Sequence, residues 1–276
     1  MEEPVTRVAR LPGGPALPYA EQGDPAGTPV VLLHAVGDSW RAFEPLMAGL
    51  PAELHVLAPS QRGHGGADCP PQGYRPADFA ADLAAFLDLL GIERPVLVGA
   101  SSAGFTVRRY AADHPGRVRG LVLLGSPALL SDKPEAGALR EAVARMADPL
   151  DPAVVRGTVE SLVARPLPPD FVDLMVQEGL RVPARVWRDT VEALFDETGP
   201  EGPDRITAPA LLIWGDRDGI LPRADQERLA AALPRSALLV HEGSGHIVQW
   251  DDPGRTAADL AAFVAACCGG GGQSAA

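Results

Sequence analysis

The chain has 276 residues, of which 46% are hydrophobic and 22% charged, and its formal net charge is −12. This length suits one sizeable globular domain with an insertion. The negative charge repels phosphate backbones and argues against nucleic acid as a partner. No apolar run approaches the roughly 20 residues that a membrane span needs, so we expect no membrane insertion. The N-terminus lacks the basic start and apolar core of a signal peptide, which favours a cytoplasmic location.

The three cysteines, Cys69, Cys267 and Cys268, predict neither a disulfide framework nor a metal site. Their number is odd, two of them are adjacent, and none has the spacing typical of zinc ligands. We therefore expect no metal.

Short apolar runs recur along the chain and predict strands. Val5–Arg10 and Ala16–Glu21 are amphipathic and flank the Pro12-Gly13-Gly14 turn, which predicts a β-ribbon. Pro29–His34 is continuously apolar, the pattern of a strand buried on both faces. Similar runs are Leu54–Ala58, Pro95–Gly99, Val118–Leu124, Ala210–Trp214 and Ala237–His241.

Helical patterns separate these runs. They cover Ala42–Leu50, Pro76–Leu90, Ala103–Asp113, Ala224–Leu233 and Ala257–Cys267. Strands that alternate with helices predict an α/β fold, in which a mostly parallel, doubly wound sheet is covered on both faces.

The segment from about Ser131 to Arg205 contains no strand-like run. Its helical patterns are Leu139–Ala147, Ala153–Ala164, Asp170–Glu178 and Ala184–Phe195. A segment of about 75 residues is too long for a loop inside a compact domain. We therefore predict an α/β core formed by residues 1–130 and 206–268, a helical cap at 131–205 inserted after the sixth strand, and a disordered glycine-rich tail at 269–276.

The segment Val96-Leu-Val-Gly-Ala-Ser-Ser-Ala-Gly-Phe105 joins an apolar strand to a helix through small residues around a serine. A sharp strand-to-helix turn strains the nucleophile and crowds the residues two positions on either side, so it needs small neighbours. The segment resembles the nucleophile elbow Gly-x-Ser-x-Gly of the α/β-hydrolase family. Ala103 stands where the family has glycine, and Gly104 follows it. The resemblance implies Ser101 as the nucleophile.

Two other interpretations of this serine pair remain open. The frame Ala100-x-Ser102-x-Gly104 would make Ser102 the nucleophile. A serine is also a preferred residue at a helix N-cap, where it needs no catalytic role. We favour Ser101 because Gly99 directly closes the strand.

Two later loops resemble the family's acid and histidine loops. Gly215-Asp-Arg-Asp218 follows a predicted strand, and the resemblance implies Asp218 as the acid that orients the histidine. Aspartate and glycine also dominate turns, a role that suits Asp216, although Asp216 stays open as an alternative acid. Glu242-Gly-Ser-Gly-His246 follows the last predicted strand, and His246 is implied as the general base. The order Ser, Asp, His along the chain is that of the family.

The segment Leu33-His-Ala-Val-Gly-Asp38 resembles the family's His-Gly-x loop, with Ala35 in place of glycine. The resemblance implies that the backbone N–H groups of Val36 and Ser102 form the oxyanion hole. It implies a structural, hydrogen-bonding role for His34. The matching motifs span residues 34–253, nearly the whole chain.

The resemblance implies a serine hydrolase that cleaves a carboxylic ester or lactone through an acyl-enzyme, without metal or organic cofactor. A serine nucleophile excludes the aspartate chemistry of haloalkane dehalogenases and epoxide hydrolases. We expect apolar residues of the cap to cover the active site, although most of them would form the cap's own core. They are Phe171, Leu174, Met175, Trp187, Leu194 and Phe195. The expected partner is therefore a small-molecule substrate with a mostly apolar acyl part.

Several activities share these motifs and remain alternatives. They are carbon–carbon bond hydrolase, enol-lactonase, thioesterase and cofactor-free haloperoxidase. A ligand-binding receptor or regulator that retains the fold is a further alternative from a different class.

Overall fold

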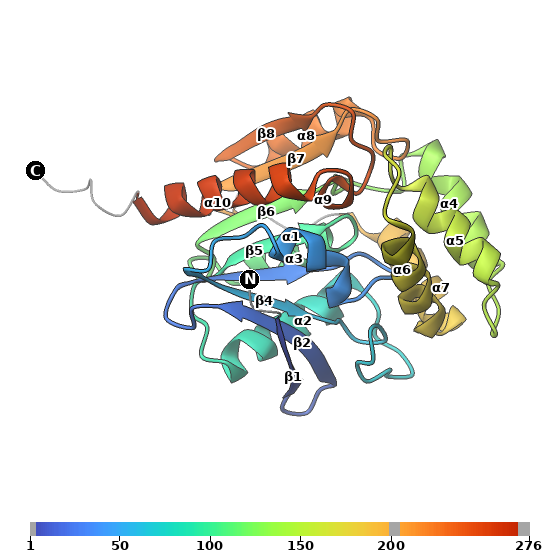
Figure 1. Ribbon diagram of the computed structural model, residues 1–276, viewed down its shortest axis with the longest axis horizontal. Helices are drawn as coiled ribbons and strands as arrows, with labels where there is room; N and C mark the ends of the chain where they lie inside the picture. Colours follow the sequence, from blue (N-terminus) through green and yellow to red (C-terminus); the bar gives the residue numbers. More distant parts are fainter. Residues whose placement is uncertain (1–3, 199–204, 270–276) are drawn as a thin grey trace, which may run out of the picture.

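A computed structural model describes residues 4–198 and 205–269. Its eight-stranded sheet has the order β1-β2-β4-β3-β5-β6-β7-β8 (Figure 1). β2 pairs antiparallel with β1 and β4, and every other neighbouring pair is parallel, so the predicted mostly parallel sheet is confirmed. The strands are β1 (Val5–Arg10), β2 (Ala16–Gly23), β3 (Thr28–Leu33), β4 (Leu54–Pro59), β5 (Val96–Ala100), β6 (Gly120–Leu124), β7 (Ala210–Gly215) and β8 (Ser236–His241).

Helices cover both faces of the sheet because successive strand residues point to opposite faces. Leu97 of β5 packs into one apolar layer with α2, α3 and α8, whereas its neighbours Val96 and Val98 pack into another with α1 and α10. The helices of the core are η1 (Trp40–Phe43), α1 (Glu44–Met47), α2 (Pro76–Leu89), α3 (Ala103–Asp113), α8 (Arg223–Ala232), α9 (Val248–Asp251) and α10 (Pro253–Gly269).

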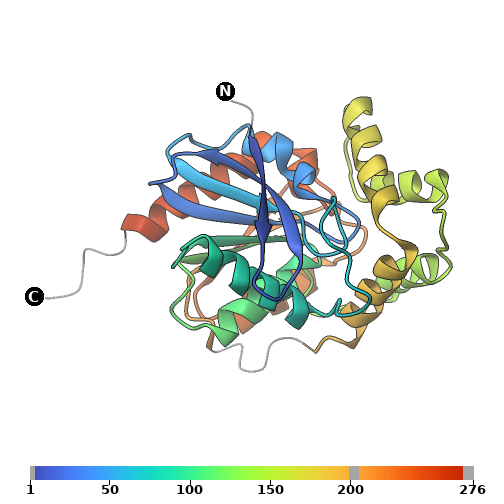
Figure 2. The ribbon, with the colours of Figure 1, turned by 90° about the horizontal axis from the view of Figure 1, so that it is seen from below.

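Within the described residues, four helices lie between β6 and β7, in the segment predicted to form a helical cap, and their role as a cap stays a prediction. They are α4 (Pro134–Ala144), α5 (Pro152–Ser161), α6 (Pro169–Arg181) and α7 (Ala184–Asp196). Figures 1 and 2 show these helices beyond one end of the sheet rather than over either face. They share an apolar core that includes Val159, Met175 and Trp187. The cap boundaries at 131 and 205 stay a prediction.

The helix predicted at Ala42–Leu50 is instead divided into η1 and α1. Pro45 has no backbone N–H to donate and is tolerated only in the first turn of a helix, so an α-helix must start anew beside it. The one-turn helix α9 is too short to produce a periodic pattern. α10 ends at Gly269, the first residue of the predicted tail, and the rest of that tail lies outside the described residues. No helix in the described ranges could cross a bilayer.

Candidate active site

Ser101 lies between the last residue of β5 and the first residue of α3, where the chain turns sharply. Its φ of +47° is the only positive value among the non-glycine residues that the structure describes. This left-handed conformation costs an L-residue energy and is typical of functional sites. A Cβ at position 99 would lie 2.8 Å from the carbonyl oxygen of Ala103, so Gly99 is required by this close approach. Position 103, where the family motif has glycine, is occupied by a buried alanine.

The structure brings Ser101, His246 and Asp218 into one hydrogen-bonded chain. Ser101 Oγ lies 2.8 Å from His246 Nε2, and His246 Nδ1 lies 2.9 Å from Asp218 Oδ2. Because a carboxylate only accepts, Nδ1 carries the proton and Nε2 is left to accept from the serine hydroxyl. The other oxygen of Asp218 accepts from the N–H groups of Ile220 and Leu221 at 2.8 and 2.9 Å. These backbone donors hold the buried carboxylate in place.

The two alternative residues lie elsewhere. Asp216 accepts a 2.6 Å hydrogen bond from the N–H of Gly243 and therefore joins the loops after β7 and β8. Ser102 has helical dihedral angles, and its hydroxyl bonds to the chain at Val36 rather than to His246.

The expected oxyanion hole contains a side chain that sequence reasoning missed. Ser102 Oγ accepts a 2.9 Å hydrogen bond from the N–H of Val36, one of the two expected oxyanion donors. The sequence motif gives the residue after the nucleophile only a backbone role, so nothing in it indicated this hydroxyl. Both Val36 and Ser102 line the cavity that contains Ser101.

Two buried histidines hold the loops beneath this hole. His34 donates from Nδ1 to the carbonyl oxygen of Ala35 at 2.8 Å, and its Nε2 accepts from the N–H of Gln61 at 2.9 Å. His64 donates from Nδ1 to the carbonyl oxygen of Arg62 at 2.8 Å. Burial lowers the pKa of His34 to about 3 and the pKa of His64 to about 4, so both rings are neutral at pH 7.

Asp251 of α9 ties the cap to the loop that carries His246. Its carboxylate accepts from the N–H of Gly245 at 2.5 Å and from the N–H of Arg165 at 2.8 Å. The N–H of Ala164 also points to it, at 3.1 and 3.2 Å from its two oxygens. Three backbone donors on one buried carboxylate fix both segments. The sequence pattern gave no indication of this role for Asp251, which stands two residues before Pro253.

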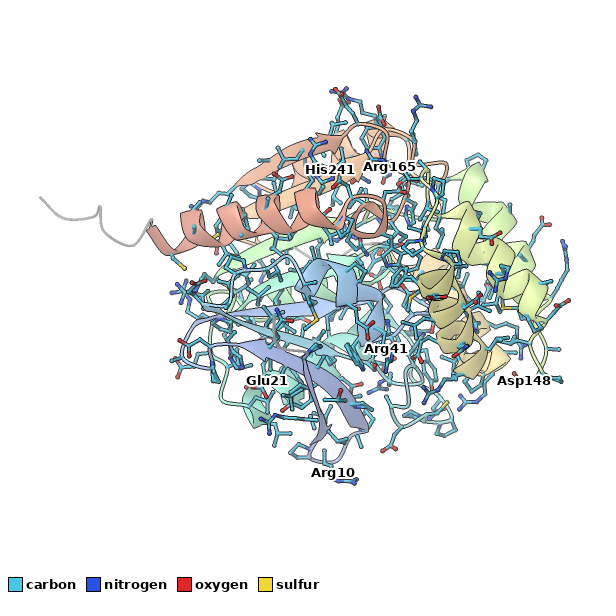
Figure 3. All side chains as sticks on the ribbon, in the orientation of Figure 1. Arg10, Glu21, Arg41, Asp148, Arg165 and His241 are labelled. Carbon is cyan, nitrogen blue, oxygen red and sulfur yellow. The ribbon has the colours of Figure 1, made fainter. Side chains whose placement is uncertain are left out.

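The Arg165 side chain reinforces the same junction. Its guanidinium donates to the carbonyl oxygens of Glu242 and Gly243, each at 3.2 Å. Figure 3 labels Arg165 and also His241, the last residue of β8, after which the histidine loop begins. The N–H of Ile247 donates in turn to the carbonyl oxygen of Leu162 in the cap, at 3.1 Å.

Ser101 and His246 lie in the wall of one cavity. Three of the apolar cap residues expected to cover the site, Trp187, Leu194 and Phe195, line it. The other three, Phe171, Leu174 and Met175, pack in the cap core. Among the residues that the structure describes, no lysine or arginine lies in the wall of this cavity. Across residues 4–198 and 205–269, no group of three His, Cys, Asp or Glu side chains is arranged to hold a metal.

Residues 28–192 and 183–253 match the model of the alpha/beta hydrolase fold family. The chain belongs to this family, and the predicted fold class is confirmed.

Individual relatives share this fold but differ in the activity that they are named for. An uncharacterized protein of Mycobacterium tuberculosis is 30% identical over 249 residues, which cover 83% of this chain and 73% of that protein. Epoxide hydrolase A of the same organism is 28% identical over 309 residues, 91% of this chain and 94% of that protein. The structure of an esterase from Exiguobacterium antarcticum matches with a TM-score of 0.85 at 23% identity, over 95% of this chain and 100% of the esterase. The last likeness shows the fold alone.

Proposed function

We propose that the protein is a serine hydrolase that cleaves a neutral carboxylic ester or lactone through an acyl-enzyme. The observation that carries this proposal is the chain of hydrogen bonds from Ser101 through His246 to Asp218, at the wall of an apolar cavity. A nucleophile, a base and an acid that orients the base are the groups that acyl transfer needs.

Each side chain has a defined role in the proposed reaction. Ser101 Oγ attacks the acyl carbonyl carbon while His246 Nε2 takes the hydroxyl proton. The alkoxide leaving group receives that proton when the tetrahedral intermediate collapses. Water then attacks the acyl-enzyme with His246 as base again, which releases the acid and restores Ser101. Asp218 holds the histidine tautomer and stabilises the imidazolium.

The oxyanion of each tetrahedral intermediate needs two donors, and we assign them to the backbone N–H groups of Val36 and Ser102. An N–H placed in this way contributes on the order of 3 kcal/mol to the transition state. Both groups belong to residues of the cavity wall, and Ser102 is also the N-cap residue of α3, where free N–H groups favour negative charge.

The cavity supports a substrate with an apolar acyl part. Its wall contains apolar cap side chains and, as far as the described residues reach, no lysine or arginine that could pair with a substrate carboxylate. Each buried methylene of the acyl chain contributes about 0.8 kcal/mol. The enol-lactonase and carbon–carbon hydrolase alternatives, which handle carboxylated substrates, are favoured less because they call for an arginine fork.

We do not propose epoxide hydrolysis, the activity in the name of one relative, for this chain. Epoxide opening in this family uses an aspartate that forms an alkyl ester, whereas a serine stands at the elbow here. Cofactor-free haloperoxidase activity uses the same triad and stays an alternative, as does a receptor that binds ligand without turnover.

A labelling experiment tests the proposal. An organophosphonate should add one adduct to the protein, mapped by mass spectrometry to Ser101, and the protein should turn over p-nitrophenyl hexanoate. Ser101→Ala should lose both properties with its fold intact. Binding of the ester without turnover would favour the receptor alternative, and an adduct on Ser102 would show that the other elbow frame is the functional one.

A further inference from the structure

One carboxyl group, that of Asp38, lies in the wall of the active-site cavity with Ser101 and His246. Asp38 is only 8% exposed to solvent. Asp38 follows Val36 by two residues, so it belongs to the loop that supplies an oxyanion donor. The catalytic mechanism proposed above does not use it.

The bonding of this carboxyl is incomplete. The backbone of Ala35 favours its charged form and so lowers its pKa, but less than burial raises it. Within the described ranges no lysine, arginine or histidine side chain forms an ion pair with it, and no side chain hydrogen-bonds to it. A buried polar group without its partners costs free energy and calls for an explanation.

The cap packs against the loop that carries Asp38 and contributes a second acid, Glu178, that acts on it. The loop before it packs against α7, because a Cβ at Gly37 would lie 1.9 Å from the Trp187 ring. Glu178 of α6 is 4% exposed and bonds to Arg181 at 3.1 Å. Burial first, and the charge of Glu178 second, raise the pKa of Asp38 well above its usual range. This shift favours the protonated form of Asp38, which has one O–H to donate, and no side chain in the described ranges hydrogen-bonds to it.

We propose that Asp38 is a specificity-determining residue whose O–H donates a hydrogen bond to a ketone or ether oxygen on the otherwise apolar substrate. The inference rests on the proposed function, since it names the substrate class of the same cavity. A protonated Asp38 offers a substrate ammonium no charge to pair with, and the charge of Glu178, which acts on Asp38, would repel a substrate carboxylate. A neutral oxygen acceptor completes the bonding of Asp38 without adding charge.

The test compares kcat/KM for p-nitrophenyl hexanoate with its 4-oxo and 5-oxo analogues, and for butyl hexanoate with 2-methoxyethyl hexanoate. These pairs place an acceptor at different distances on the acyl and alcohol sides. We expect the wild type to prefer at least one acceptor-bearing ester by roughly 3- to 10-fold over its alkyl match. Asp38→Leu and Asp38→Ala should abolish that preference.

Two further variants separate this role from a structural one. In Asp38→Asn the amide N–H still donates, so the preference should stay within about threefold of the wild type. Thr158→Val changes another polar residue of the same wall, whose hydroxyl already donates to the carbonyl oxygen of Val154 at 3.0 Å, and should leave the preference unchanged. A merely structural Asp38 would lower the rates on all esters together and leave their ratios as they are.

Two results would overturn the inference while leaving the hydrolase intact. One is hydrolysis of the alkyl esters without a preference in any pair. The other is a preference for p-nitrophenyl 6-aminohexanoate that Asp38→Asn abolishes, which would show an ionised carboxylate. If no ester is hydrolysed, the proposed function fails. The role of Asp38 is then decided separately by calorimetry, which compares the binding of 5-oxohexanamide and hexanamide to Ser101→Ala. The same comparison in Ser101→Ala combined with Asp38→Leu shows whether any preference depends on Asp38.

Discussion

The backbone N–H of Val36 donates to the hydroxyl oxygen of Ser102 at 2.9 Å. A single N–H cannot serve this hydroxyl and a substrate oxyanion at full strength together. If the N–H of Val36 binds the oxyanion as proposed, the Ser102 side chain must either rotate away from Val36 or itself take part in binding the oxyanion.

We expect Ser102→Ala to match or exceed the wild-type kcat on p-nitrophenyl esters, because the N–H of Val36 is then free for the oxyanion. Steady-state kinetics with Ser102→Thr as the control, which keeps a hydroxyl, would measure this. A loss of more than about tenfold in Ser102→Ala, roughly 1.4 kcal/mol, would show instead that the hydroxyl donates to the oxyanion.

The two aspartates of the acid loop should differ sharply. Asp218→Asn replaces the acceptor of His246 Nδ1–H and leaves the histidine in the wrong tautomer, so kcat should fall by several orders of magnitude, on the order of 10⁴. Asp216→Asn keeps an oxygen for the N–H of Gly243 and should cost less than about tenfold. Equal losses in kcat, or the reverse ranking, would contradict the role proposed for Asp218.

Asp251 should matter for catalysis although it lies outside the triad. Asp251→Asn turns an amide N–H₂ toward backbone donors that now bond to the carboxylate, and this should cost about 1–3 kcal/mol in unfolding free energy and lower kcat. Denaturant unfolding and kcat on p-nitrophenyl butanoate measure both effects. Asp252→Asn is the matched control, since this neighbour is more exposed and lies 3.3 Å from Arg165. Similar effects at both positions would contradict the special role of Asp251.

The neutral buried histidines predict a pH dependence of stability. The pKa of His64 is about 4 when folded, below its ordinary value of about 6.5 when unfolded. The unfolded state therefore binds more protons, and stability is lost as the pH falls from about 6.5 to about 4, by roughly 2–3 kcal/mol for this ring. His64→Gln should lose that much less unfolding free energy between pH 7 and pH 4. An unchanged pH dependence in the variant would contradict the assignment.

Substrate length and charge provide a further prediction. For unsubstituted p-nitrophenyl esters, kcat/KM should rise from acetate to about hexanoate, since each added methylene is buried against the apolar cavity wall. Carboxylated analogues should be poorer substrates, because none of the described residues in that wall is a lysine or arginine. A preference for carboxylated substrates above about tenfold would favour the enol-lactonase or carbon–carbon hydrolase alternative.

The sequence predicted the fold well because strands buried on both faces produce continuous apolar runs, such as that of β3, which periodicity detects. It also named the residues that meet at His246, since turns around a nucleophile demand small residues such as Gly99. It missed Asp38, the hydroxyl of Ser102 and Asp251. The roles of these polar groups depend on which distant segment lies against them, and local patterns carry no signal for that.

The link from Asp251 to Ala164 and Arg165 limits how the cap can be exchanged among relatives. A cap moved between proteins to alter specificity would normally be joined near its first and last residues. Here the connection between α5 and α6 also determines where His246 lies. A transplanted cap that lacks the backbone path of residues 162–165 would therefore bring a new substrate preference together with a misplaced base. We therefore expect that a change of cap in this chain alters substrate preference and the position of His246 together.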